Sequence, residues 1–137
     1  MLSKKNLFLG LAQGMEYIHS KHLMYNGIKP KSVLILIDSA EPKNVRAKWS
    51  SSRLLSERME LRETKCLTEE EALWKAPELI TGQFEQPETV ESNTFAAGLV
   101  FAYVLLGGEH LFGSNDSQII SNMKNNKPIN LHSEYRM

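Results

Sequence analysis

The residues of clearest chemical interest form the stretch "YNGIKPKS", at positions 25–32. The amine of Lys29 could contact a phosphate group, and the hydroxyl of Ser32 could act as a weak metal ligand. The stretch contains no carboxylate and no histidine, which are the usual proton acceptors in catalysis. It is therefore either an active-site loop that has lost its chemistry or a surface turn, and its flanking elements must decide which.

Other reactive side chains lack partners at a useful spacing. Cys66 is the only cysteine, which excludes a disulfide within the chain and argues against a zinc site. A single thiol favours a reducing, intracellular and cytoplasmic setting. His22 and His110 have no matching ligands nearby in the sequence. We therefore expect no bound metal.

The charge balance argues against a nucleic-acid partner, and the apolar pattern argues against a membrane span. The chain has 137 residues, of which 16 are Lys or Arg and 16 are Asp or Glu. Domains that bind nucleic acid usually carry a basic excess, so we expect no nucleic-acid partner. The longest apolar run, at residues 95–106, is too short to cross a bilayer, so we expect a buried helix and no membrane span.

The first half of the chain is predicted to form a helix, a loop and a hairpin. An amphipathic helix is expected over residues 4–21, from apolar residues at helical spacing, namely Leu7, Leu11, Met15 and Ile18. Gly10 and Gly14 weaken this helix but would let another backbone approach it closely. The runs "VLILI" and "VRAKW" predict the two strands of a hairpin over residues 33–49.

The second half is predicted to be helical, with one long irregular loop. Residues 50–78 are polar and mostly without period, apart from a short helix near "EEEALW" that Pro77 ends. Helices are expected over residues 90–106 and 115–126, the second with Ser114 or Asn115 as its N-cap. The predicted fold class is mainly α with a small β-hairpin, an α+β domain.

Three motifs in order resemble a known family. The stretch "YIHSKHLMYNGIKPKSVLI" resembles the catalytic loop of eukaryotic protein kinases, and "WKAPELITG" resembles the Ala-Pro-Glu motif that closes the activation segment. "SNTFAAGLVFAYVLLGGEHLFG" resembles the helix that follows in kinases, with wording similar to the inositol-requiring stress sensors of the endoplasmic reticulum and their ribonuclease L relatives. The resemblance covers residues 4–131 and favours a catalytic-loop remnant over a surface turn.

The resemblance implies a single, partial kinase-like domain over residues 1–137, the C-terminal lobe alone and incomplete. Few residues precede the first helix, so we expect no N-terminal lobe and no glycine-rich loop over a nucleotide. A lobe without its last helices would leave apolar faces of the helix at residues 95–106 uncovered, and such patches mark partner surfaces.

The resemblance also assigns roles to residues of the loop at 25–32. The base aspartate of kinases falls at Gly27, which can accept no proton, and the histidine and arginine before it fall at Tyr25 and Asn26. Lys29 matches the catalytic-loop lysine, and Ser32 stands where kinases have a metal-binding asparagine. A solvated loop lysine is the alternative for Lys29, because its supporting acids are missing.

The remaining motif positions hold residues that could keep a structural role. Trp49, Ser50 and Ser51 stand where kinases have the metal-binding Asp-Phe-Gly triplet. The closing motif is kept as Ala76, Pro77 and Glu78, and Glu78 is expected to be unpaired or exposed. Asn93 replaces a helix aspartate, and its amide oxygen can still accept a hydrogen bond from the loop backbone. His19 matches a structural histidine.

These substitutions predict a catalytically inactive kinase-like fragment, a pseudokinase that acts by binding or regulation. No ATP, magnesium or other cofactor is expected, because base, metal ligands and N-terminal lobe are missing together. The stress-sensor family associates through kinase domains, so the expected partner is another kinase-like domain or a regulatory protein. The alternative is a truncated serine/threonine kinase, with ATP binding and phosphotransfer only in a longer parent.

Overall fold

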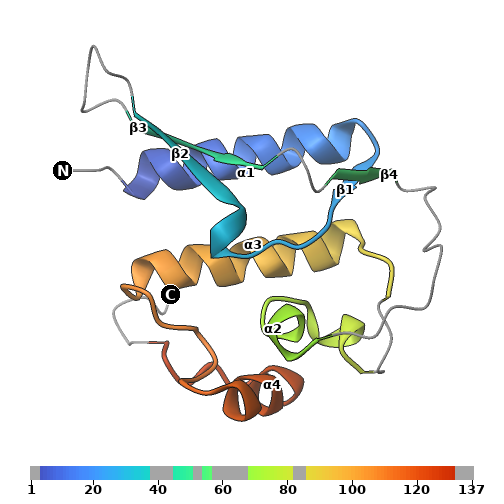
Figure 1. Cartoon of the computed structure of the whole chain (residues 1–137), viewed down its shortest axis with the longest axis vertical. Helices are drawn as coiled ribbons and strands as arrows, with labels where there is room; N and C mark the ends of the chain where they lie inside the picture. The colour runs from blue at the N-terminus through green and yellow to red at the C-terminus, as the bar shows by residue number, and fades with distance from the viewer. Residues whose placement is uncertain (1–3, 38–44, 51–53, 57–67, 82–85, 132–137) are drawn as a thin grey trace.

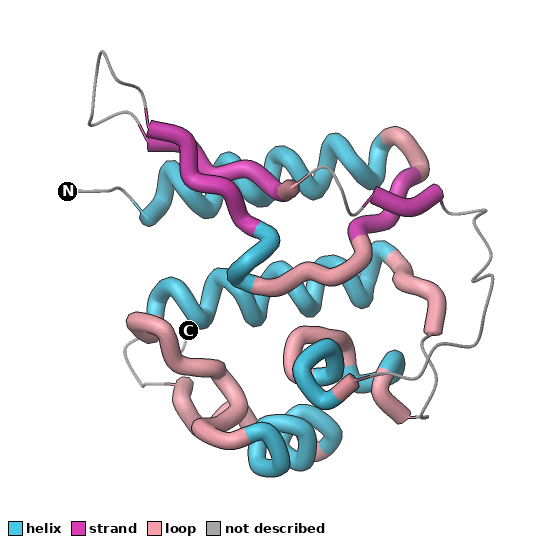
Figure 2. The backbone as a smooth tube through the Cα atoms, in the orientation of Figure 1, coloured by secondary structure: helices cyan, strands magenta, loops and turns pink. Residues whose placement is uncertain are grey.

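Two long helices form the centre of the molecule, with a hairpin over one and two short helices beneath the other (Figure 1). The computed structural model describes residues 4–37, 45–50, 54–56, 68–81 and 86–131. Helix α1 (Lys4–Ser20) and helix α3 (Val90–Leu105) lie side by side and run in roughly opposite directions. The segment that contains residues 25–32 passes between the hairpin and α3 (Figure 2).

Helix α1 buries the predicted apolar stripe. Leu11 and Met15 are buried in the upper core, and Leu7 and Ile18 pack against it. The glycines permit the close approach that their spacing suggested, because a Cβ on Gly10 would lie 3.1 Å from the carbonyl oxygen of Ala47. The helix ends at Ser20, one residue before the predicted boundary at 21.

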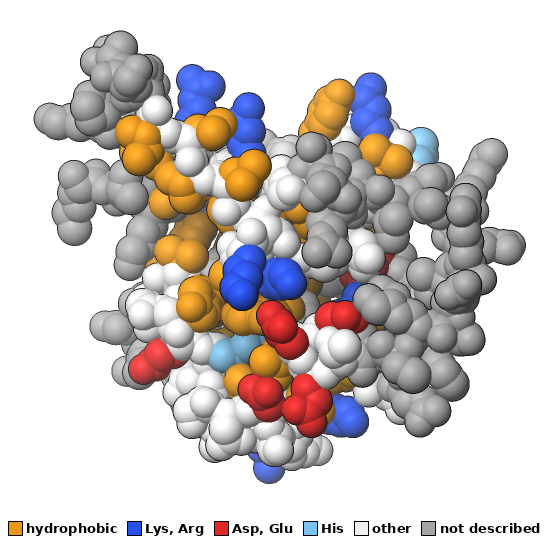
Figure 3. Space-filling model, viewed as in Figure 1, with side chains coloured by type: hydrophobic (Ala, Val, Ile, Leu, Met, Phe, Trp, Pro, Cys, Tyr) orange, Lys and Arg blue, Asp and Glu red, His pale blue; other side chains and the backbone are white. Residues whose placement is uncertain are grey.

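The hairpin consists of β2 (Val33–Ile37) and β3 (Val45–Trp49), paired antiparallel from Val33 opposite Trp49 to Ile37 opposite Val45. Strand β3 alternates as a strand with one buried face should, and it lies against α1. Strand β2 is different, because Leu34, Ile35, Leu36 and Ile37 are all exposed. Apolar side chains accordingly gather on the surface over the hairpin (Figure 3).

A second strand pair was not predicted. Strand β1 (Leu23–Tyr25) pairs antiparallel with β4 (Leu54–Ser56), which lies inside the segment expected to be irregular. Strands of three residues carry no readable period, so only the tertiary pairing reveals them. The described residues therefore form two two-stranded sheets rather than one hairpin.

Helix α3 separates two hydrophobic clusters. Ala96, Ala97 and Val100 belong to the upper cluster with α1, and Leu99 belongs to the lower one. A capping box of Thr89 and Ser92 fixes its first turn. It ends at Leu105, one residue before the predicted 106, and positive φ angles at Gly107 and Gly108 follow.

The expectation of an uncovered apolar face on residues 95–106 is wrong for the aromatic side chains. Phe101 stacks on Phe8 with ring centroids 4.9 Å apart, and Phe95 stacks on Phe112 at 6.3 Å. Tyr103 meets Trp74 edge to face. With these contacts residues 101–106 are half-buried, and four of the large exposed apolar side chains lie on β2.

The lower cluster is closed by α2 (Glu69–Ala72), a 3₁₀ turn (Pro77–Leu79) and α4 (Asp116–Lys124). Its buried members include Ala72, Ile80, Phe112, Ile119 and Met123. Helix α4 is shorter than the predicted 115–126, because Asn115 is its N-cap and Asn125 its C-cap. Among the described residues, no helix is long and apolar enough to cross a membrane.

Candidate functional site

Gly27 and Ser32 set the shape of the loop at residues 25–32. Gly27 has a φ of 78°, in the left-handed region that glycine adopts without steric cost. The hydroxyl of Ser32 donates to the Gly27 carbonyl at 2.6 Å, and the Ser32 amide donates to the Lys29 carbonyl at 2.9 Å. Ser32 is buried, so its hydroxyl serves the loop backbone.

Asn93 holds the strand that leads into the loop. Its Oδ1 accepts from the Tyr25 amide at 2.8 Å, and its Nδ2 donates to the Tyr25 carbonyl at 3.0 Å. The Nε2–H of His19 also donates to Asn93 Oδ1, at 3.1 Å. The side chain of Asn93 is fully buried, so α1, α3 and the loop are joined at one amide. An ionised aspartate could accept these hydrogen bonds but could donate none.

Tyr25 and Trp49 connect the loop to the position of the expected metal triplet. Tyr25 is fully buried, and its hydroxyl donates to the Ser50 carbonyl at 2.5 Å. The Tyr25 and Trp49 ring centroids lie 5.6 Å apart. The indole N–H of Trp49 donates to the Leu11 carbonyl at 2.9 Å. These residues contribute rings and backbone bonds to the core, whereas Ser51 lies outside the described residues.

Two other named positions of the loop, Asn26 and Lys29, are half-buried. Lys29 precedes the 3₁₀ turn at Pro30–Ser32 and makes no ion pair with a described residue. Across the described part of the chain, no three His, Cys, Asp or Glu side chains gather as a metal site would require.

A buried ion pair beside the closing motif was missed by the sequence reasoning. Lys75 Nζ lies 2.8 Å from Glu88 Oε2, with side chains 8% and 6% exposed. Glu88 Oε1 accepts from Ser92 Oγ and Asn93 Nδ2, each at 3.1 Å. The pair therefore extends the network around Asn93 to the residue before Ala76. A lysine between Trp74 and Ala76, in an otherwise apolar segment, was the available signal.

The closing motif itself shapes a turn. Ala76 is buried at 1% exposure and caps the 3₁₀ turn that Pro77 begins. Pro77 supplies the fixed φ that a first helical position favours. Glu78 is exposed, as one of the two expected alternatives had it. The three residues of the motif thus serve packing and the direction of the chain.

His110 is a structural histidine in the lower half of the molecule. Its Nε2–H donates to the Leu73 carbonyl at 2.6 Å, and its Nδ1 accepts from the Phe112 amide at 3.1 Å. Both nitrogens are thus used by the neutral ring. Burial lowers the pKa of His110, and the bond to the Leu73 carbonyl offsets only part of that effect.

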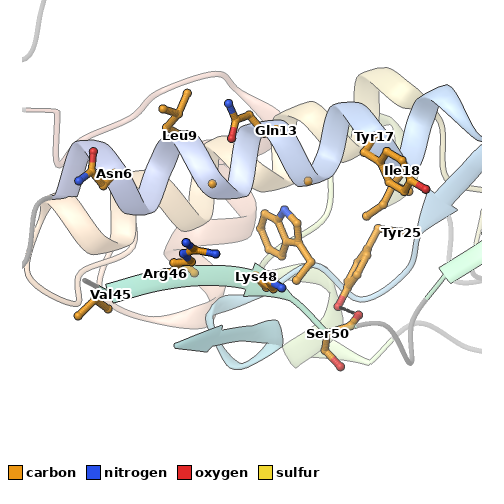
Figure 4. A pocket seen from close by; sticks show the side chains of 14 residues that line it. Asn6, Leu9, Gln13, Tyr17, Ile18, Tyr25, Val45, Arg46, Lys48 and Ser50 are labelled. Atoms are coloured by element: carbon orange, nitrogen blue, oxygen red, sulfur yellow. Dashed lines mark hydrogen bonds between the residues drawn. The ribbon is translucent and has the colours of Figure 1, made fainter. Parts of the chain in front are cut away.

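A cleft of about 610 Å³ lies between α1 and β3 (Figure 4). Its wall includes Tyr25, Trp49 and Ser50, so it borders the loop at residues 25–32 on the side of α1. Sequence reasoning did not predict it, because the two elements that form it are distant in sequence.

The order of helix, loop, hairpin, closing motif and central helix defines a protein kinase domain. The family model for the protein kinase domain matches residues 3–136, and the chain therefore belongs to this family.

A particular relative is the sensor for unfolded proteins in the ER, ire1, of Schizosaccharomyces pombe. It is 27% identical over 132 residues, a match that covers 80% of this chain. The same match covers 12% of the relative, so the chain corresponds to a small part of that protein. The similarity agrees with the resemblance to the stress-sensor family seen in the sequence.

Proposed function

We propose that this chain is a catalytically inactive kinase-like module that acts by binding or regulation. The single observation that carries the proposal is Gly27. Glycine stands where the resemblance places the proton acceptor, and its φ of 78° lies in the left-handed region that glycine adopts without steric cost. General base catalysis typically contributes about 10²–10⁴-fold in rate, and this chain has no side chain at that position to supply it.

The positions implied to bind metal support the same conclusion. The Ser32 hydroxyl donates to the Gly27 carbonyl, and the Trp49 ring is held in the core by its bond to Leu11. Neither arrangement presents the carboxylates that hold magnesium in kinases. Lys29 remains as a cation without those acids. ATP and magnesium belong to active relatives under this proposal, and the module itself uses no cofactor.

The proposal further treats the chain as the C-terminal lobe of a kinase domain, incomplete and working through a partner. The exposed apolar side chains of β2 are the surface that supports a partner, because an exposed apolar patch marks an interaction site. The partner class is another kinase-like domain or a regulatory protein. A cytoplasmic setting is proposed as well, on the basis of the single thiol of Cys66.

The experiment is a phosphotransfer assay with radiolabelled ATP and magnesium on the purified chain. We expect no label in the chain or in a generic protein substrate above a no-enzyme control. Label that depends on ATP and disappears in Lys29→Ala would overturn the proposal. A thermal-shift series with MgATP, run beside it, is expected to leave the unfolding temperature unchanged.

A second candidate is a piece of a longer serine/threonine kinase of the stress-sensor type. The observation in its favour is the 12% share of the relative that this chain covers. A longer transcript that encodes a glycine-rich loop upstream would identify such a parent. In that parent, nucleotide binding is expected to return, and phosphotransfer only if Gly27 and Trp49 are also replaced by aspartates.

A further inference from the structure

The cleft between α1 and β3 has the size and build of a small-molecule site. Its volume of about 610 Å³ falls within the range of about 300–1,000 Å³ usual for ligand pockets. Gly10 and Gly14 of α1 line it, so part of the helix wall carries no side chain. A Cβ on Gly14 would already lie 3.5 Å from Cδ1 of Trp49. The two glycines therefore let β3 lie close to α1, and they line the cleft with backbone.

The apolar wall of the cleft is held in place before any ligand arrives. Trp49 is fixed by its bond to the Leu11 carbonyl, and Tyr25 by its bond to the Ser50 carbonyl. Tyr17 and Ile18 of α1 complete this wall, and the exposed ring of Tyr17 stands near its end (Figure 4). Fixed aromatic rings favour a flat apolar ligand, because little side-chain entropy is lost on binding.

The charge of the cleft is one-sided. Arg46 and Lys48 both line it, and both are exposed on β3 (Figure 4). They are two residues apart in a strand, so their side chains leave the backbone about 7 Å from each other. The described residues that line the cleft include no Asp and no Glu. A single acidic group could therefore meet two cations that have no competing carboxylate in the cleft.

We propose that the cleft between α1 and β3 binds a small amphiphilic anion, a flat apolar body that carries a carboxylate. The apolar body lies against Trp49 and the exposed ring of Tyr17, and the carboxylate faces Arg46 and Lys48. The proposal goes beyond the loss of phosphotransfer and does not depend on it. No nucleotide and no metal takes part, so the two ideas succeed or fail separately.

The test follows the two indole N–H signals of the protein by NMR while 2-naphthoate is added. The chain has two tryptophans, Trp49 and Trp74, and Trp74→Phe assigns their signals. We expect saturable movement of the Trp49 signal and a still signal for Trp74. The neutral amide of the same ring, 2-naphthamide, is the matched probe. We expect the acid to bind about threefold to tenfold more tightly, as two screened ion pairs allow.

Three variants test where the two compounds bind. Arg46→Gln with Lys48→Gln should remove the preference for the acid and leave amide binding unchanged. Lys124→Gln with Lys127→Gln removes the same charge at exposed positions in and after α4, and should keep the preference. Gly14→Leu fills the cleft and should weaken both compounds by about tenfold or more through steric clash. Leucine also favours a helix more than glycine does, and circular dichroism checks that each variant is folded.

Several results would overturn the proposal. Equal affinity for acid and amide would show that Arg46 and Lys48 do not contribute to binding. Binding that leaves the Trp49 signal unmoved would show that the compound does not bind in the cleft. A Trp49 signal that moves with protein concentration in the absence of ligand would show that a second copy of the chain occupies the cleft. Saturation by an acidic peptide, with no response to naphthoate, assigns it to a protein partner.

Discussion

At the residue scale, Gly27 lacks the carboxylate of the kinase motif and also sets the backbone conformation of the loop. Its φ of 78° and the bond from Ser32 to its carbonyl belong to one loop conformation. An L-residue in this region costs about 1–2 kcal/mol, less for Asn or Asp. An acid at residue 27 would therefore add a carboxylate and also strain the loop. The present loop conformation is the one that suits glycine.

Gly27→Ala is expected to lower the free energy of unfolding by about 1–2 kcal/mol, because alanine disfavours positive φ. Gly27→Asp should lower the free energy of unfolding by less than Gly27→Ala does. The Gly27→Asp protein should still show no phosphotransfer. Urea unfolding measures the change. The control is Gly98→Ala in α3, where an added Cβ meets nothing within 4 Å. That change should stabilise the protein by about 0.5–1 kcal/mol. Equal effects of the two alanines would contradict the role of the backbone.

His110 gives a second prediction at this scale, in pH dependence. Burial lowers its pKa in the folded chain, so near neutrality the unfolded chain binds more protons than the folded one. The contribution of neutral His110 is present above its usual pKa of about 6.5 and is lost as the pH falls toward the lowered value. Stability should therefore rise with pH through this window.

Urea unfolding at several pH values between about 5.5 and 7.5 tests this expectation around the usual histidine pKa. His110→Gln should flatten the rise, since glutamine does not titrate. His22→Gln, at an exposed residue, should leave it as it is. A rise that survives in His110→Gln would show that another group is responsible.

At the element scale, a buried polar network joins the parts that the hydrophobic pattern leaves separate. Lys75, Glu88 and Asn93 connect the closing motif, the start of α3 and the strand before the loop. Glu88 Oε2 pairs with Lys75, and Glu88 Oε1 accepts from the neutral donors of Ser92 and Asn93. Removing one partner of a buried ion pair costs about 3–5 kcal/mol, because the remaining charge is left without compensation.

Lys75→Met is therefore expected to lower the free energy of unfolding by about 3 kcal/mol. Glu88→Gln added to it should restore most of the loss, since glutamine is neutral and its oxygen can still accept from Ser92 and Asn93. Urea unfolding of the two singles and the double gives the coupling between residues 75 and 88. Additive losses would mean that the ion pair is not formed in solution.

The sequence predicted those elements that have a period or a cap. The stripe of α1, the alternation of β3 and the cap of α4 were each readable, with boundaries within two residues. Strands β1 and β4, the Lys75–Glu88 pair and the cleft were not, because each depends on residues far apart in sequence. For the candidate site, motif order located the loop and predicted that the Asn93 oxygen accepts a hydrogen bond from its backbone. Only tertiary geometry revealed that Asn93 Nδ2 donates back to the Tyr25 carbonyl.

At the scale of the whole molecule, its apolar surface is unevenly distributed. Four consecutive side chains of β2, from Leu34 to Ile37, are 44–67% exposed, whereas the aromatic side chains of α3 are packed. Both faces of this strand meet solvent, and among the described strands only β3 pairs with it. An exposed apolar strand with one open edge invites pairing with another chain. Without a partner, the chain is expected to associate with itself through β2.

Ile37→Lys tests this expectation, since an edge lysine blocks strand pairing. Sedimentation at rising concentration should show self-association of the unchanged chain and a monomer for the variant. The side chain of Ile37 is 67% exposed, so the free energy of unfolding should barely change. Ile129→Lys adds the same charge at a residue 53% exposed outside the hairpin, and should still associate. If both lysine variants are monomers, net charge rather than β2 governs association. That result would contradict the proposal that the hairpin is the partner surface.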